Sequence, residues 1–138
     1  MHILVPLDGS KTAVNALKHV AARRRRGEKL KVTVVHVQVP IPPSRQISRE
    51  VIRQWQKDEF ERATSSKEDV RKLVKSLKAD VKLLLGSPAE EIVQFARKND
   101  CDEIVMSTQG TGTLAGRLLG SVASKVVQLT TLPVTLVH

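Results

Sequence analysis

Short apolar runs alternate along this chain with longer segments in which apolar residues recur every three or four positions. Runs that are apolar on both faces are typical of buried parallel strands, and the three-to-four spacing is typical of helices. The pattern predicts strands over residues 3–7, 32–39, 81–85, 102–107 and 132–137. It predicts helices over residues 13–26, over 48–78 with a break near 64–66, from 87 to the turn at 99–100, and over 118–129.

This order of elements predicts an α/β fold. A strand, a helix and a second strand form a right-handed crossover, so the strands run parallel and helices cover both faces of the sheet. We therefore expect a five-stranded parallel sheet in a three-layer, Rossmann-like arrangement. The chain has 138 residues, of which 41% are hydrophobic, and it shows no repeat or linker, so we expect a single domain over residues 1–138.

Local signals mark the ends of two helices. Ser10 is a candidate N-cap for the first helix, and the basic run of residues 23–26 followed by Gly27 predicts its end. Ser87 is a candidate cap for a later helix, with Pro88 at the first helical position and Glu90 at the capping-box position.

The segment 107–121 carries the clearest functional signal. Ligands bind to parallel sheets beyond the carboxyl ends of the strands, and this Gly/Thr-rich segment follows the fourth predicted strand. At Gly120 and Ser121, free amides at a helix start and the Ser121 hydroxyl would form an anion site. The segment contains no Walker Gly-Lys-Ser/Thr, and Asp8-Gly9-Ser10 after the first strand is no Rossmann fingerprint, so hydride chemistry has no support.

The same segment resembles the nucleotide loop of the universal stress protein family. ATP-binding members carry Gly, two residues, Gly, nine residues, and then Gly-Ser or Gly-Thr. Here Gly110 matches the second glycine, nine residues follow it, and Gly120-Ser121 closes the motif. The ILVPLDGS opening, the His36-Val37 pair, GSPAEEI and the closing PVTLV are also similar to the family, so the resemblance spans nearly the whole chain. It implies a fold like that of the adenine nucleotide α-hydrolases.

The resemblance also implies a role for residues at the ends of three predicted strands. Asp8 would face the adenine or ribose of the nucleotide, and Pro6 would shape the end of its strand. Val37 would lie against adenine, with neighbouring backbone groups bonding to the base. Met106 and Ser107 would line the same site. The alternatives are that Asp8 is a turn residue and that Val37 belongs to the core.

The phosphates of the nucleotide would lie along the glycine-rich segment. Gly110 would approach the ribose and phosphate, and the amides of Gly120, Ser121 and Val122 would bind the phosphates. The alternative for Ser121 is a simple N-cap. One position departs from the family motif, because Ser107 stands where the first glycine is expected. If that glycine requires a positive φ, serine would be strained by about 1 kcal/mol; otherwise its hydroxyl could bond the ligand.

Catalytic and nucleic-acid functions have less support. The four histidines at positions 2, 19, 36 and 138 fit core or surface roles, and the alternation of His36 with Val37 predicts that His36 points away from the site. One helical lysine, Lys125, could neutralise phosphate. A hydrolase needs a base or a metal cluster to position water, so we expect ATP binding, with or without Mg²⁺, and at most slow hydrolysis. AMP or ADP are further candidate ligands.

The net charge of +9 invites anionic partners, but two Phe, one Trp and no Tyr leave little for base stacking. A nucleic-acid surface would have to use residues 23–26 with Lys72, Lys75 and Lys78, and is not favoured. The favoured function is an ATP-binding regulatory module; the alternative is a family member that acts through protein contacts alone, and an enzyme is the least supported.

The remaining expectations concern assembly and location. The apolar strand at 134–137 would seek a partner at its edge, so we expect a homodimer through it, as is common in the family. The sequence shows neither a signal peptide nor an apolar stretch of bilayer length, and it has a single cysteine, Cys101, so we expect a cytoplasmic protein without a membrane anchor, a disulfide or a metal site.

Overall fold

The computed structural model describes residues 1–65, 67–108 and 119–138. Its strands are β1 (His2–Pro6), β2 (Lys31–Gln38), β3 (Asp80–Leu85), β4 (Glu103–Ser107) and β5 (Val134–Val137). Its helices are α1 (Ala13–Arg25), α2 (Arg49–Thr64), α3 (Glu68–Ser76), α4 (Pro88–Lys98) and α5 (Ser121–Leu129). Every predicted strand is present, and the break near residue 65 divides the predicted long helix into α2 and α3.

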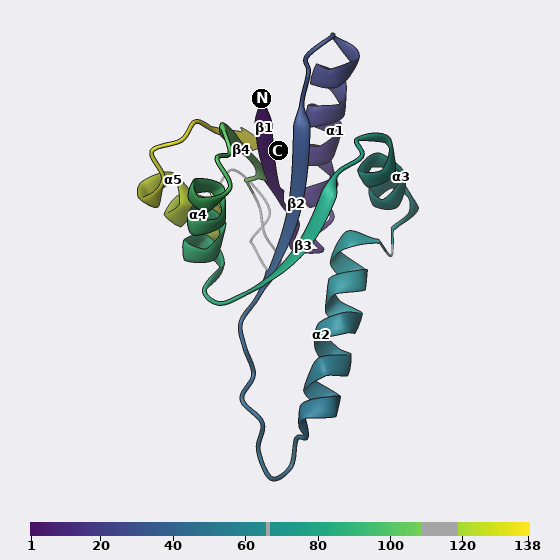
Figure 1. Cartoon of the computed structure of the whole chain (residues 1–138), viewed down its shortest axis with the longest axis vertical. Coiled ribbons are helices and arrows are strands. Elements are labelled where there is room, and N and C mark those ends of the chain that lie inside the picture. The colour runs from purple at the N-terminus through teal and green to yellow at the C-terminus, as the bar shows by residue number, and fades with distance from the viewer. Residues whose placement is uncertain (66, 109–118) are drawn as a thin grey trace.

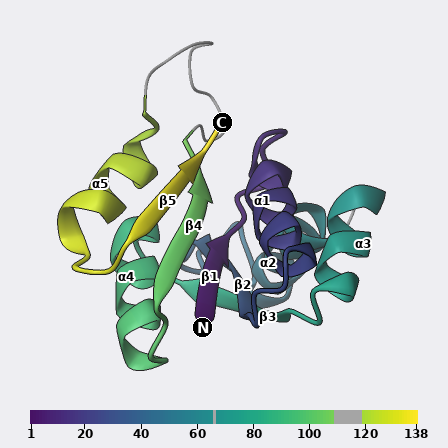
Figure 2. The same ribbon diagram turned by 90° about the horizontal axis from the view of Figure 1, so that it is seen from above.

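All five strands belong to one parallel sheet with the order β3-β2-β1-β4-β5. Helices α4 and α5 cover one face, whereas α1 and α3 cover the other (Figure 1, Figure 2). Side chains of β1 alternate between these two layers, because Ile3 and Val5 pack with α1 while Leu4 packs with α4 and α5. This alternation explains why β1 is apolar throughout, and it confirms the predicted α/β sheet.

The chain order creates a crevice beside β1. From β1 the chain proceeds outward to β2 and β3, and then it returns to place β4 and β5 on the other side of β1. Connections on the two sides of such a point run away from each other, which leaves space beyond the carboxyl ends of the central strands. Helix α2 extends well beyond the sheet at the carboxyl end of β2, together with the segment that precedes it (Figure 1).

One predicted helix cap and one predicted helix start are wrong. Helix α1 begins at Ala13 as predicted, but Thr12, not Ser10, occupies its N-cap position, and the Thr12 side chain makes no cap bond to the backbone. The Ser10 amide instead donates to the Asp8 carboxylate. The last helix begins at Ser121, because Leu119 and Gly120 are not helical, and residue 118 lies outside the described residues. Ser87 does occupy the N-cap position of α4, but it makes no cap bond to the backbone.

Three helices end in the same left-handed turn. Gly27, Lys78 and Asp100 follow α1, α3 and α4 with φ of 99°, 49° and 52°. In each case the amide of this residue bonds the carbonyl three residues back, and the next amide bonds the carbonyl five residues earlier. This is the Schellman arrangement, in which glycine is favoured because it lacks a Cβ. Only the first of the three turns has a glycine.

Replacing Lys78 with glycine is expected to raise the free energy of unfolding by about 0.5–1 kcal/mol, because the left-handed conformation costs a residue with a Cβ about 1–2 kcal/mol. Lys78 is exposed, so little packing is lost. Urea denaturation measures the change. Lys72→Gly, within α3, is the control and is expected to lower the stability by about 1 kcal/mol. A Lys78→Gly protein less stable than wild type would contradict the assignment of this turn.

Candidate functional site

A cavity of about 310 Å³ lies in the crevice at the carboxyl ends of β1, β2 and β4, beside the start of α5. The structure brings eight of the nine predicted site residues to its walls, and Gly110 lies outside the described residues. The eight are Pro6, Asp8, Val37, Met106, Ser107, Gly120, Ser121 and Val122. They come from four separate elements and from loops, and only the sheet topology makes them neighbours.

The cavity also has walls that sequence reasoning missed. Most of them are apolar: Leu7, Ala13, Val35, Pro88, Ile92 and Ala123. Glu59 comes from α2, His36 from β2 and Thr108 follows β4. No signal marked Glu59, because it lies in a long charged segment where many residues look alike. Leu7, Thr108 and Ala123 are direct sequence neighbours of predicted residues, and could have been included on that ground.

One end of the cavity is an unpaired strand edge at Val37. Peptide groups in a parallel strand point alternately to the two neighbouring strands. The Val35 carbonyl accepts from Leu7 on the β1 side at 2.8 Å, and the Gln38 carbonyl accepts from Gly86 on the β3 side at 2.9 Å. Val37 must therefore direct its amide and carbonyl to the β1 side, where β1 has already ended. Neither group has a protein partner among the described residues.

The other end of the cavity is the start of α5. The first amides of a helix have no partner within the helix, and those of Ser121, Val122 and Ala123 form no hydrogen bond within the described residues. The Gly120 amide was also predicted to bind phosphate, but it donates to the Thr108 carbonyl at 2.6 Å. Gly120 therefore fixes the loop to the helix start, and the anion-binding amides begin one residue later.

Asp8 lies at the cavity in a turn of its own. Its carboxylate accepts the Ser10 amide at 2.9 Å, and the side chain is exposed. Gly9, the next residue, has a φ of 82°, which the turn requires. Asp8 is therefore a turn residue, as the alternative interpretation predicted. Its second carboxylate oxygen has no hydrogen-bond partner among the described residues.

Ser107 ends β4 without the strain that the missing glycine could have caused. Among the described residues, only Lys78 and Asp100 combine a side chain with positive φ. The Ser107 hydroxyl donates to the Thr12 hydroxyl at 2.9 Å, which links β4 to the start of α1. The serine is therefore compatible with the backbone at this position, and its hydroxyl is engaged with the protein beside the cavity.

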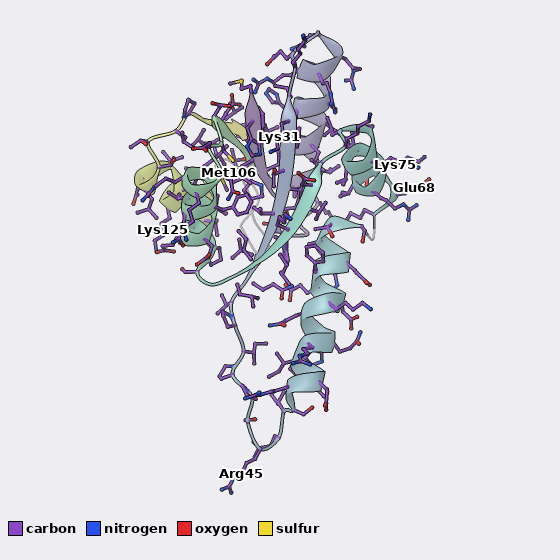
Figure 3. All side chains as sticks on the ribbon, viewed as in Figure 1. Lys31, Arg45, Glu68, Lys75, Met106 and Lys125 are labelled. Atoms are coloured by element: carbon purple, nitrogen blue, oxygen red, sulfur yellow. The ribbon has the colours of Figure 1, made fainter. Side chains whose placement is uncertain are left out.

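The charges around the cavity are mostly negative. Asp8 and Glu59 are carboxylates, and no lysine or arginine is among the described residues that line it. Lys125, a candidate phosphate partner, instead pairs with Glu90 of α4 at 2.5 Å and lies at the outer surface, whereas Met106 is buried (Figure 3). Hydrogen bonds from Lys125 and then Ser87 lower the pKa of Glu90 to about 2. An anion in the cavity would therefore depend on the backbone amides of α5.

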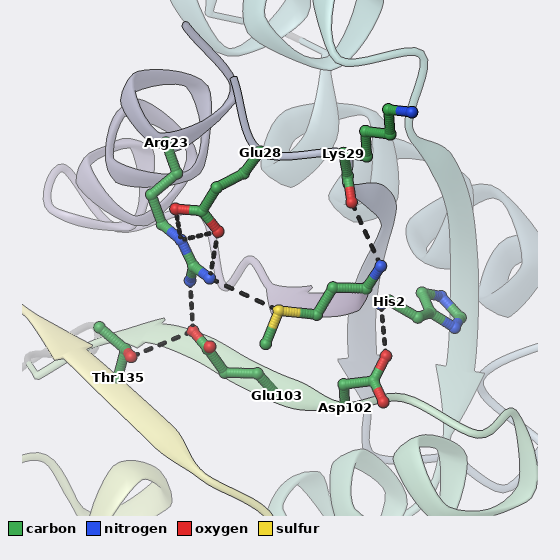
Figure 4. Close-up of polar contacts among 8 residues, drawn as sticks. His2, Arg23, Glu28, Lys29, Asp102, Glu103 and Thr135 are labelled. Carbon is green, nitrogen blue, oxygen red and sulfur yellow. Dashed lines mark hydrogen bonds and ion pairs between the residues drawn. The ribbon is translucent and has the colours of Figure 1, made fainter. Parts of the chain in front are cut away.

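The basic run at the end of α1 is partly committed to the protein interior. The Arg23 guanidinium binds Glu103 of β4 at 2.6 Å and Glu28 at 2.8 Å, and its side chain is only 14% exposed (Figure 4). Thr135 of β5 also donates to Glu103 at 3.1 Å. Hydrogen bonds to Glu28 and Glu103 raise the pKa of Arg23 against the effect of burial. Arg23 is therefore not available for a nucleic-acid surface.

Cys101 is a buried thiol at the opposite edge of the sheet. It is 5% exposed, and its sulfur lies 3.6 Å from Nδ1 of His2. Burial, followed by the charge of Asp102, raises the pKa of Cys101 to about 11. The thiolate is the reactive form of cysteine, so a catalytic role has no support here.

We expect Cys101 to react with a disulfide reagent such as DTNB at least about tenfold more slowly than a free thiol at pH 8, where it is almost fully protonated. Absorbance of the released thiolate follows the reaction. The same protein unfolded in guanidinium is the control, and its thiol is expected to react completely. A folded protein that reacts as fast as the unfolded one would show that the thiol is accessible and ionised.

Comparisons with known proteins agree with this geometry. The model of the universal stress protein family matches residues 1–138. Universal stress protein MJ0531 of Methanocaldococcus jannaschii is 35% identical over 139 residues, which cover 98% of this chain and 80% of that protein. Universal stress protein UspA from Lactobacillus plantarum has the same fold, with a TM-score of 0.83 at 21% identity, over 100% of this chain and 97% of that one.

A further solved structure contains a nucleotide. The universal stress protein from Archaeoglobus fulgidus in complex with dAMP has a TM-score of 0.59 and 26% identity to this chain. The match covers 100% of this chain and 98% of that one. The topology, the cavity at the carboxyl edge and the whole-length family match all lead to one assignment. The chain belongs to the universal stress protein family.

Proposed function

We propose that this chain is a regulatory module that binds an adenine nucleotide in the cavity between Val37 and the start of α5. The observation that carries the proposal is that the cavity has two different ends, which correspond to the two ends of a nucleotide. A purine base needs apolar walls and a donor–acceptor pair, and its phosphate needs an array of amide donors. A donor–acceptor pair at Val37 and an array of amide donors at the start of α5 lie at two ends of one cavity, and neither has a partner in residues 1–65, 67–108 and 119–138.

The base would lie at the β2 end. Val35, Ile92 and Pro88 provide apolar walls, and the Val37 amide and carbonyl provide one donor and one acceptor. The 6-amino group and N1 of adenine are a matching donor and acceptor. Asp8, at the end of β1, would then accept from a ribose hydroxyl.

The phosphate would lie at the α5 end, on the amides of Ser121–Ala123 and the Ser121 hydroxyl. The positive end of the helix dipole favours an anion there. The dAMP complex of the Archaeoglobus fulgidus relative supports an adenine nucleotide as the ligand class. We propose ATP as the ligand, with Mg²⁺ entering on its phosphates, and AMP and ADP as further members of the class. The proposal assigns no residue as a general base that would position a water for attack on ATP. We therefore propose that hydrolysis is slow at most.

The alternative is a family member that acts through protein contacts alone. The two carboxylates at the cavity, without a lysine or arginine among its described walls, favour it over a triphosphate site. Urea denaturation with and without ligand separates the two. A nucleotide at 100 times its dissociation constant adds about 2.7 kcal/mol to the free energy of unfolding.

The measurement compares AMP, ATP and Mg·ATP, with GMP as the control for the base. Stabilisation by the adenine nucleotides and less by GMP is the expected result. If none of them changes the stability at millimolar concentration, the nucleotide proposal is wrong and the protein-contact function is favoured.

As part of the proposal, two chains associate through β5. This strand lies at an edge of the sheet, and neighbouring α5 carries the exposed apolar side chains of Val127 and Leu129. An unpaired apolar edge strand is a ready site for another chain. Light scattering at tens of micromolar would show a dimer, and Leu136→Lys with Leu129→Lys would show a monomer. A wild-type monomer under these conditions contradicts this association.

We also place the module in the cytoplasm, the compartment that holds the proposed ligands. Within the described ranges, the helices are too short or too polar to cross a bilayer.

A further inference from the structure

The pairing of β1 with β2 stops one hydrogen bond before its regular end. The register is Pro6 with Val35, and the Leu7 amide continues it by donating to the Val35 carbonyl at 2.8 Å. In a parallel pair the next bond would run from the Val37 amide to the Leu7 carbonyl. Leu7 and Val37 both belong to the described residues, but this bond is missing. The Leu7 carbonyl has a different partner.

That partner is the imidazole of His36. Its Nδ1 lies 2.7 Å from the Leu7 carbonyl oxygen, and the side chain is 3% exposed. A carbonyl oxygen only accepts, so Nδ1 must carry a proton and donate this bond. The ring therefore binds the same acceptor that would otherwise complete the strand pair.

Among the residues that the structure describes, the Leu7 carbonyl is the only polar group that the ring contacts. Nε2 is buried and has no hydrogen-bond partner in the described part of the chain. On its other side the ring faces Phe60 of α2, with ring centroids 6.4 Å apart. The His36 side chain points to the opposite face of the sheet from Val37. His36 is nevertheless among the residues that line the cavity, although its alternation with Val37 predicted that it points away from the site. A buried nitrogen without a hydrogen-bond partner lowers the stability of the fold. The hydrogen bond from Nδ1 to the Leu7 carbonyl is the favourable contact that offsets this cost.

We propose that His36 is a positioning residue that keeps the peptide edge of Val37 open for the ligand. This inference rests on the proposed function for the identity of the ligand, and it adds the reason why the edge is unpaired. By binding the Leu7 carbonyl, the ring ends the strand pair at Val35 and leaves the Val37 amide and carbonyl facing the cavity. His36 does not touch the nucleotide; it acts through Leu7 and Val37.

Two substitutions test the role of the ring. His36→Leu removes the donor, whereas the side-chain amide of His36→Asn can still donate near the position of Nδ1. In His36→Leu we expect the Val37 amide to pair with Leu7, so that its hydrogen exchange becomes at least about tenfold slower in the free protein. We expect the dissociation constant for AMP to rise at least about tenfold in the same variant. His36→Asn is expected to keep both quantities within about threefold of wild type, since it retains the donor.

His2→Leu is the matched control. The His2 ring also contacts a backbone carbonyl, that of Asn99 at 3.2 Å, but at the opposite edge of the sheet. The His2→Leu substitution is expected to change the stability without changing the hydrogen exchange of the Val37 amide or the affinity for AMP. A Val37 amide that exchanges in His36→Leu as it does in wild type would overturn the inference, and so would unchanged AMP binding in that variant.

The wild-type protein gives an independent test if His36→Leu does not fold. Its Val37 amide is expected to exchange rapidly without ligand and to be slowed by AMP. Protection of that amide in the free protein overturns the inference whatever binds. If wild type binds no nucleotide, the proposed function fails, and the exchange of Val37 in the free variants alone decides whether His36 keeps this edge open.

Discussion

Arg23→Met is expected to lower the free energy of unfolding by about 3 kcal/mol, which is about 10 °C in Tm for a chain of this length. The reason is the position of Glu103, whose side chain is only 8% exposed and which binds Arg23 at 2.6 Å. Methionine retains the apolar stem of arginine but leaves this carboxylate with the Thr135 hydroxyl as its remaining described partner. An uncompensated charge in a nearly buried position is costly. Thermal and urea denaturation measure the loss.

A double variant identifies the cause of this loss. Arg23→Met with Glu103→Leu removes both charges, and it is expected to be more stable than Arg23→Met alone, because no unpaired charge remains. Glu28→Gln is the control, since Glu28 is 42% exposed and the loss of a solvent-exposed ion pair is expected to change the stability only slightly. If Arg23→Met and Glu28→Gln have equal small effects, the buried pair does not join α1 to β4 as described.

Ser121→Glu is expected to weaken AMP binding at least about a hundredfold while leaving the stability unchanged or slightly higher. A carboxylate in the first turn of α5 is favoured by the helix dipole, so the fold gains a few tenths of a kcal/mol. The same carboxylate would occupy the place of the nucleotide phosphate and repel it. Isothermal titration calorimetry measures the affinity, and urea denaturation measures the stability.

Gln128→Glu provides a control with the same change in net charge, on an exposed residue two turns farther along α5. Its effect on AMP affinity is expected to be less than about threefold, because exposed charges at that distance are largely screened. Adenosine, which has no phosphate, is expected to bind Ser121→Glu nearly as it binds wild type. Equal affinity of wild type and Ser121→Glu for AMP would contradict the placement of the phosphate at the start of α5.

The sheet could be predicted from the sequence because its signals are local. The apolar runs of β1 and β4 are long enough to be recognised, and the glycine after α1 marks a helix end. The failures occur where tertiary contacts decide. Ser10 has a side chain suited to capping, but its amide is bound in the Asp8 turn and Thr12 occupies the N-cap position of α1 instead. The positive φ of Lys78 and Asp100 carries no sequence signal, since neither is glycine.

The candidate site was predictable to a similar extent. Strand ends could be compared with the motif of a known family, and that comparison named residues that do meet at one cavity. Glu59 was not predictable, because its place depends on how far α2 extends from the sheet. Two hydrogen bonds join residues that are distant in the sequence: the Gly120 amide donates to Thr108, and the Leu7 carbonyl accepts from His36. Such pairings decide which backbone groups stay free, and no spacing in the sequence reports them.

The amide spectrum of the protein during titration with AMP tests the nucleotide site most directly. If the nucleotide spans the cavity, the largest ¹⁵N–¹H shift changes fall on the amide of Val37 and on those of Ser121, Val122 and Ala123, and all saturate at one AMP per chain. A spectrum unchanged at millimolar AMP, or changes confined to exposed basic residues far from the cavity, would contradict the site.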